Sequence, residues 1–318
     1  MNPSSRYALA ISHPSHELRV YGWVERNRPI VYVLTDGGGR SQLPRLQKTA
    51  ELLDQLGATT GAVFGRIPDL DLYAAILDVD VALFRSLAEE IAADLIARRI
   101  DVIAGDAAEG YSAAHDTWRI LIDAAVMLVR DAGHEIENRQ FFVVAPPDEI
   151  EEDAQGVQRV ILDEGEFERK IAAVRACSPT LSADVDEAMA GGQFYGVRHF
   201  MEPQVGGKPD VALNEALTQR LLSDRRFRER MASLSRGFDL AAFHEEIFWL
   251  RDPSAPLYAS VPPLFEAYGE ELVRAGRYER VIRYDEHLLP IAEALKSTCE
   301  ATERSASRGN AEAQRQSR

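Results

Sequence analysis

Two histidines stand three residues apart in the stretch SHPSHE, which ends the short apolar run YALAIS. The whole chain holds only seven histidines in 318 residues. A proline between His13 and His16 fixes the backbone, so the two imidazoles can turn toward one point. Neutral imidazole suits zinc, and a catalytic zinc needs three protein ligands plus a water position. Taken alone, the pair has a simpler interpretation as a helix cap and a polar rim residue.

A third histidine strengthens the metal interpretation. His115 follows another apolar run, DVIAG at 101–105, and begins a long helical pattern. If both runs are parallel strands of one sheet, their carboxyl ends meet at the same edge. Three imidazoles would then converge there, which is the simplest set of ligands for a catalytic zinc.

The elements that must position these residues alternate between strand and helix. We predict strands at 7–12, 29–35, 101–105 and 139–147, and helices at 16–25, 45–57, 82–98 and 115–133. This alternation predicts an α/β fold, with an open, Rossmann-like doubly wound and mainly parallel sheet that carries helices on both faces. The loops SHPSHE, TDGGGR and GDAAEG follow successive strands, so we expect all three at one edge.

The chain divides by pattern into three parts. We predict an α/β metal-site domain at 1–147, an α+β portion at 148–296 that packs on it, and a disordered polar tail at 297–318. In the second part we expect helices near 168–178 and 260–276 and strands within 194–203 and 277–287. The sequence leaves open whether this part closes over the site or forms a contact in a homo-oligomer.

Composition limits the partners. The net charge is −15, from 51 acidic and 36 basic residues, which argues against nucleic acid and anionic membranes as partners. No apolar run approaches a membrane span, and the N-terminus lacks the pattern of a signal peptide. Cys177 and Cys299 are far apart and suggest incidental thiols in a reducing cytoplasm. We therefore expect a cytoplasmic protein that acts on a small molecule.

Five elements in order resemble one known family. SHPSHE resembles the A-H-P-D-D-E motif of the LmbE/PIG-L family of zinc-dependent N-deacetylases, in the same place after the first strand. Four further stretches are similar to that family: VLTDGGGR to its L-T-x-G element, RLQKTAELLDQLGA to its R-x-x-E-A…L-G helix, RIPD to its F-P-D turn, and GYSAAHD to its H-P-D-H segment. The likeness spans residues 5–145.

The resemblance implies a zinc site at His13, His16 and His115. His16 stands where the family has an aspartate ligand, so the site would be all-histidine and its zinc-bound water more acidic. Two positions depart from the family in a more serious way. Ser15 replaces the aspartate that serves as general base, and Ser112 replaces the histidine that stabilises the oxyanion. A serine hydroxyl does not hold a proton at neutral pH as a carboxylate does.

Other residues near the predicted edge could take over these tasks. We select Glu109 as the substitute base, with Asp106 as the second catalytic carboxylate, although both could instead cap the following helix or bond backbone amides in the loop. Tyr111 could donate a hydrogen bond to the oxyanion, with plain packing as the alternative. Asp36 and Arg40 follow the second strand and are expected to contact substrate, although surface arginine is common and the GGG stretch can be a simple turn.

These observations support three hypotheses. The first is a zinc-dependent hydrolase that cleaves an amide C–N bond, by N-deacetylation of an amino sugar or a similar small metabolite. The second is a protein on the same fold that binds a sugar-like ligand without turnover, as Ser15 and Ser112 suggest. The third is a transferase that holds a nucleotide-sugar at the GGG loop.

Overall fold

A seven-stranded sheet forms the centre of the computed structural model, which describes residues 5–38, 45–146, 149–150, 154–177, 225, 243–258 and 263–297. The strands are β1 Tyr7–Ile11, β2 Ile30–Thr35, β3 Thr59–Ile67, β4 Val102–Asp106, β5 Glu137–Phe141, β6 Gln158–Ile161 and β7 Glu245–Leu250. Their order is β3-β2-β1-β4-β5-β7-β6. The first five strands pair in parallel, whereas β7 is antiparallel to both β5 and β6.

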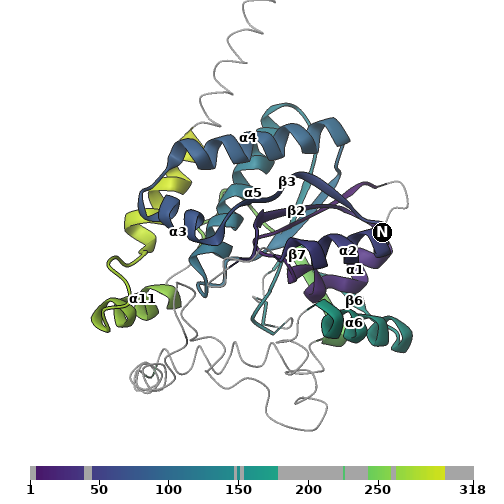
Figure 1. Ribbon diagram of the computed structural model, residues 1–318. Coiled ribbons are helices and arrows are strands. Elements are labelled where there is room, and N and C mark those ends of the chain that lie inside the picture. The colour runs from purple at the N-terminus through teal and green to yellow at the C-terminus, as the bar shows by residue number, and fades with distance from the viewer. Residues whose placement is uncertain are drawn as a thin grey trace, which may run out of the picture.

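Helices cover both faces of this sheet. They are η1 His16–Val20, α1 Tyr21–Asn27, α2 Leu46–Leu56, α3 Asp69–Leu77, α4 Val81–Arg98, α5 Ala113–Asp131, α6 Glu164–Cys177 and α11 Leu264–Arg274, with a π-helical turn, η4, at Tyr284–Leu288. Figure 1 shows α4 and α5 together on one side of the sheet, and α1, α2 and α6 on the other. The expected doubly wound, mainly parallel α/β architecture is therefore confirmed.

Strand alternation builds a separate core on each face. In β1 and β2, Ala8, Ala10, Tyr32 and Leu34 join the core beneath α3, α4 and α5. The residues between them, Leu9, Ile11, Val31 and Val33, join the core on the side of α1. Because both faces of these strands are buried, their sequences are continuously apolar rather than alternating. Polar residues in these strands are thereby confined to the carboxyl ends, where β1 gives way to Ser12 and β2 ends in Thr35.

The C-terminal elements extend the same sheet. β7 pairs with β5 through Arg139 and Gln140, so elements from both parts of the sequence share one hydrogen-bonded layer. The expected helices near 168–178 and 260–276 correspond to α6 and α11.

The expected strand at 277–287 is wrong. This segment packs on α11, with Val281 against Gly269 and the Tyr284 N–H bonded to Glu266, and it then turns into η4. Residues 194–203 and 298–318 lie outside the described residues. None of the helices in the described part of the chain is both long and apolar enough to span a membrane.

Candidate functional site

Three histidines meet at the carboxyl edge of the parallel strands. His13 follows β1, His16 begins η1, and His115 lies in the first turn of α5, after the loop that leaves β4. Their ring centroids are 5.4 Å apart for His13 and His16, 5.1 Å for His13 and His115, and 4.7 Å for His16 and His115. The crossover connections thus bring together side chains that are distant in sequence.

A left-handed turn separates the first two histidines. Ser15 has φ of 83°, a conformation that costs a non-glycine residue about 1–2 kcal/mol. Its backbone N–H donates to Thr49 Oγ1 of α2, and the Thr49 hydroxyl donates in turn to the buried carboxylate of Glu17. The turn is therefore held from outside, by a neighbouring helix, and the two imidazoles that it separates lie edge to face.

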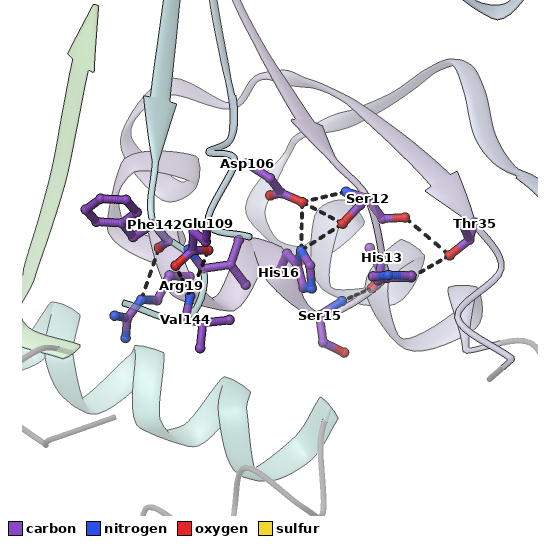
Figure 2. A network of polar contacts seen from close by, with 12 residues as sticks. Ser12, His13, Ser15, His16, Arg19, Thr35, Asp106, Glu109, Phe142 and Val144 are labelled. Atoms are coloured by element: carbon purple, nitrogen blue, oxygen red, sulfur yellow. Dashed lines mark hydrogen bonds and ion pairs between the residues drawn. The ribbon is translucent and has the colours of Figure 1, made fainter. Parts of the chain in front are cut away.

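Asp106 orients His16. Its Oδ2 atom lies 2.9 Å from His16 Nδ1 and accepts hydrogen bonds from both the backbone N–H and the hydroxyl of Ser12, as Figure 2 shows. Burial alone would raise the pKa of Asp106, but the nearby His16 and these hydrogen bonds outweigh it and hold the pKa at about 2. An ionised carboxylate only accepts, so His16 carries a proton on Nδ1, and Nε2 is the lone-pair atom when the ring is neutral.

His13 has a different set of neighbours. Its Nδ1 atom lies 2.7 Å from Thr35 Oγ1, at the end of β2, and 3.2 Å from a carboxylate oxygen of Asp69, at the start of α3. Thr35 is fully buried, while His13 and Asp69 are nearly so. The carboxylate only accepts and so favours a proton at that nitrogen, which the Thr35 hydroxyl is also able to accept.

The surroundings of His115 disfavour the charged form of its ring. Burial and the neighbouring His16 and His13 lower its pKa well below the usual range, so it is neutral. Its Nδ1 atom is buried and has no hydrogen-bond partner among the residues that the structure describes. A buried nitrogen without a partner costs about 1–3 kcal/mol, which a bound ligand would offset.

The cluster is not a closed metal cage. Within the described ranges, no group of three or more His, Cys, Asp or Glu side chains has the geometry of a metal site. The side chains expected as metal ligands are thus neighbours, and their metal binding stays a prediction.

Glu109 lies in the loop between β4 and α5, but its carboxylate is engaged elsewhere. It accepts backbone N–H groups from Val143, Val144 and Ala145, at distances between 2.6 and 3.1 Å. Burial raises its pKa to about 7, and these N–H donors oppose that rise. Figure 2 shows Glu109 beside Val144 and Arg19, apart from the histidines. These contacts favour a structural role for the residue that we selected as base.

Of the residues expected to contact substrate, one lies near the histidines, one holds a loop, and one is outside the described residues. Tyr111 is half-buried, with its ring 6.1 Å from that of His115, and burial raises its pKa. The Asp36 carboxylate accepts the backbone N–H groups of Gly38 and Asp69, and so ties the loop after β2 to α3. Arg40 lies outside the described residues.

Sequence reasoning missed three residues of this site. Ser12, Thr35 and Asp69 contact the side chains of His13, His16 or Asp106. Each carried a signal: Ser12 and Thr35 are the first polar residues after an apolar strand run, and Asp69 ends the RIPD turn. A polar residue at the carboxyl end of a buried strand points to this edge.

No protein-family model matches the chain, and no curated protein matches it significantly. Among solved structures, a deacetylase triple mutant (Orf2*T) of the teicoplanin biosynthetic pathway is similar, with 12% identity and a TM-score of 0.42 over 79% of this chain and 100% of that chain. The zinc-inhibited form of teicoplanin deacetylase Orf2 gives 12% identity and a TM-score of 0.40, over 78% of this chain and 100% of that one. Likenesses this distant assign no activity to the chain.

Proposed function

We propose that this protein is a zinc-dependent hydrolase that cleaves an amide C–N bond, by N-deacetylation of an amino sugar or a similar small metabolite. The observation that carries the proposal is the meeting of His13, His16 and His115 at the ligand-binding edge of the sheet. The ordered motifs around these histidines, which resemble those of the zinc-dependent N-deacetylases, supply the reaction class.

The spacing of the ring centroids, though not the present arrangement of the donor atoms, is the one expected around a zinc ion. A Zn–N distance of ~2.0–2.1 Å plus about 1.1 Å from nitrogen to ring centre places each centroid ~3.2 Å from the metal, so tetrahedral ligands have centroids ~5.2 Å apart. The three centroid distances lie between 4.7 and 5.4 Å. Packed aromatic rings reach similar spacings. The buried Nδ1 of His115 argues for a ligand, because packing alone leaves that polar atom without a partner.

Residues of the chain itself would bind the zinc, position its ligands and contact the substrate. His13, His16 and His115 would hold the zinc, which supplies an acidified water and polarises the acyl oxygen. Asp106 stays ionised and fixes the ring of His16, which is a positioning task. Tyr111 stays protonated because burial raises its pKa, and it would donate to the acyl oxygen. Asp36 and Arg40 remain our candidates for contacts with the rest of the substrate.

A specific observation favours one alternative, a protein that binds a sugar-like ligand without turnover. Serines occupy both positions at which the resembling family handles protons, Ser15 and Ser112. Glu109, the carboxylate that we selected to replace the base, is held by backbone amides. This alternative keeps the ligand site and removes the chemistry.

Metal content tests the proposal first. We would measure zinc by elemental analysis in the wild type, in a His16→Ala/His115→Ala variant, and in His134→Ala as an exposed control. We expect near-stoichiometric zinc in the wild type and the control, and loss in the double variant. Absence of zinc from the wild type, even after incubation with the metal, would contradict a zinc hydrolase.

A screen for acetate release from N-acetylated sugars then separates the two functions. Release by the wild type that is lost in His13→Ala supports the hydrolase. Calorimetric binding of the same sugars without any acetate would establish the alternative.

A further inference from the structure

One buried residue of β2, Thr35, contacts His13 at the outer side of the histidine cluster. We propose that Thr35 is a positioning residue that sets the tautomer of His13 and thereby directs the Nε2 atom of that ring into the cluster. The consequence for metal affinity rests on the proposed function. The tautomer itself is a property of the chain alone and can be measured without metal.

The Thr35 hydroxyl has a single hydrogen to donate. Oγ1 lies 3.2 Å from the carbonyl oxygen of Ser12, which can only accept, so the hydroxyl donates there. The N–H of Gly37 points at the same Oγ1 atom, at 3.3 Å. Toward His13 Nδ1, at 2.7 Å, the hydroxyl is then left to accept. This arrangement favours the tautomer of His13 that carries its proton on Nδ1.

A nearby carboxylate favours the same tautomer through a longer contact than the one the Thr35 hydroxyl makes. A carboxylate oxygen of Asp69 lies 3.2 Å from His13 Nδ1. If that nitrogen were a lone-pair atom, it would face the carboxylate oxygen with no proton between them, which is unfavourable in a buried site. Asp69 is nearly fully buried, so solvent does not screen this contact.

Ser12 links this arrangement to that of His16. The Ser12 carbonyl accepts from Thr35, while its own N–H and hydroxyl donate to Asp106, which holds His16 Nδ1. One buried chain of hydrogen bonds therefore runs from His13 to His16, as the dashed lines of Figure 2 show. This chain favours, in both neutral rings, the tautomer with Nε2 as the lone-pair atom. Chains of this kind restrict ring rotation and so favour metal binding.

Strand register explains why these side chains meet. β1 pairs with β2 with Ile11 opposite Val33, and the Thr35 N–H continues the pairing by donating to the Ser12 carbonyl. On the other side, Ala10 pairs with Gly105 of β4, one residue before Asp106. The positions of Thr35 and Asp106 on either side of Ser12 thus follow from the parallel register.

The test compares Thr35→Val, which removes the hydroxyl with little change in shape, with Thr35→Ser, which keeps it. Thr117→Val is the matched control, because Thr117 is also fully buried and its hydroxyl has no hydrogen-bond partner in the described part of the chain. The histidine nitrogens of the metal-free full chain would be assigned by ¹⁵N NMR above pH about 8, where imidazole is neutral. Zinc affinity would be measured by competition with a chelator.

We expect wild type, Thr35→Ser and Thr117→Val to hold the His13 proton on Nδ1, and Thr35→Val to shift it at least partly to Nε2. The zinc Kd of Thr35→Val should rise by about tenfold or more, and that of Thr35→Ser should stay near the wild-type value. If Thr35→Val does not fold, Thr35→Ala takes its place.

Two results would overturn the assignment. One is a wild-type His13 with its proton on Nε2. The other is a Thr35→Val variant whose proton stays on Nδ1, since Asp69 would then fix the ring. If the wild type binds no zinc, the proposed function fails, but the tautomer measurement still decides the role of Thr35.

Discussion

Substitution of Glu109 by glutamine separates a structural role from a catalytic one. The carboxylate accepts N–H groups from Val143 through Oε2, from Ala145 through Oε1, and from Val144 through both atoms. Glutamine keeps one oxygen and places an NH₂ group where the other stood. At least one backbone N–H then faces a donor instead of an acceptor, in a site that is 5% exposed.

The size of the effect follows from these contacts. A hydrogen bond to a charged acceptor contributes about 1.5–3 kcal/mol, and a buried donor left without a partner costs a similar amount. Loss of the buried charge offsets part of this, because burial opposes ionisation of Glu109. We therefore expect Glu109→Gln to lower the free energy of unfolding by about 2–3 kcal/mol.

Urea unfolding of the zinc-loaded protein would measure this change, with Glu89→Gln on the exposed face of α4 as the matched control. The control should unfold as the wild type does. A Glu109→Gln variant that keeps wild-type stability and full zinc, yet releases no acetate, would refute the structural role. Glu109 would then be the base that we selected from the sequence.

Three further predictions follow from other contacts. Lys170→Met should lower the free energy of unfolding by about 3–5 kcal/mol, measured in urea, because Lys170 and Glu246 form a fully buried ion pair and the substitution leaves the carboxylate unpaired. The hydrogen bond from Arg26 lowers the pKa of Glu166 below its usual 4.5, so this pair stabilises the fold above that pH, and the stabilisation is lost as the pH falls. In urea unfolding, Glu166→Gln should therefore lower the free energy of unfolding less in acid than at neutral pH. Asp106→Asn should weaken zinc binding by roughly 10–100-fold in chelator competition, since the anion that fixes His16 is gone.

The sheet was predictable where burial acts on both faces of a strand. Continuous apolar runs identified β1, β2 and β4, because parallel strands that are buried on both faces have apolar residues at nearly every position. β3 at the edge was missed. Its sequence, TTGAVFGRI, alternates irregularly between exposed, half-buried and buried residues and contains two glycines, one of which, Gly61, lies directly against the ring of Tyr32. Sequence propensity does not show that a glycine in an edge strand serves a close contact.

The histidine cluster was predictable for a topological reason, and its hydrogen-bond partners were not. Carboxyl ends of parallel strands share one edge, so His13 and His115 had to approach each other once the strands were identified. The partner of Glu109 is the backbone after β5, which no side-chain pattern reveals. Thr35 and Asp106 reach the histidines through strand register, and register is a property of the folded sheet.

The left-handed turn at Ser15 offers the sharpest separation of the two proposed functions. Aspartate and asparagine tolerate φ of 83° better than serine does, so Ser15→Asp and Ser15→Asn should both fold at least as well as the wild type. Only aspartate adds a base, between the two histidines of the loop.

If the wild type binds its sugar without turnover because the base is missing, Ser15→Asp should release acetate while Ser15→Asn should not. If the wild type is an enzyme with its base elsewhere, Ser15→Asp should not exceed it. Acetate release from N-acetylated sugars by the zinc-loaded variants measures the difference. A Ser15→Asn variant as active as Ser15→Asp would show that relief of the turn, and not a carboxylate, raises the rate.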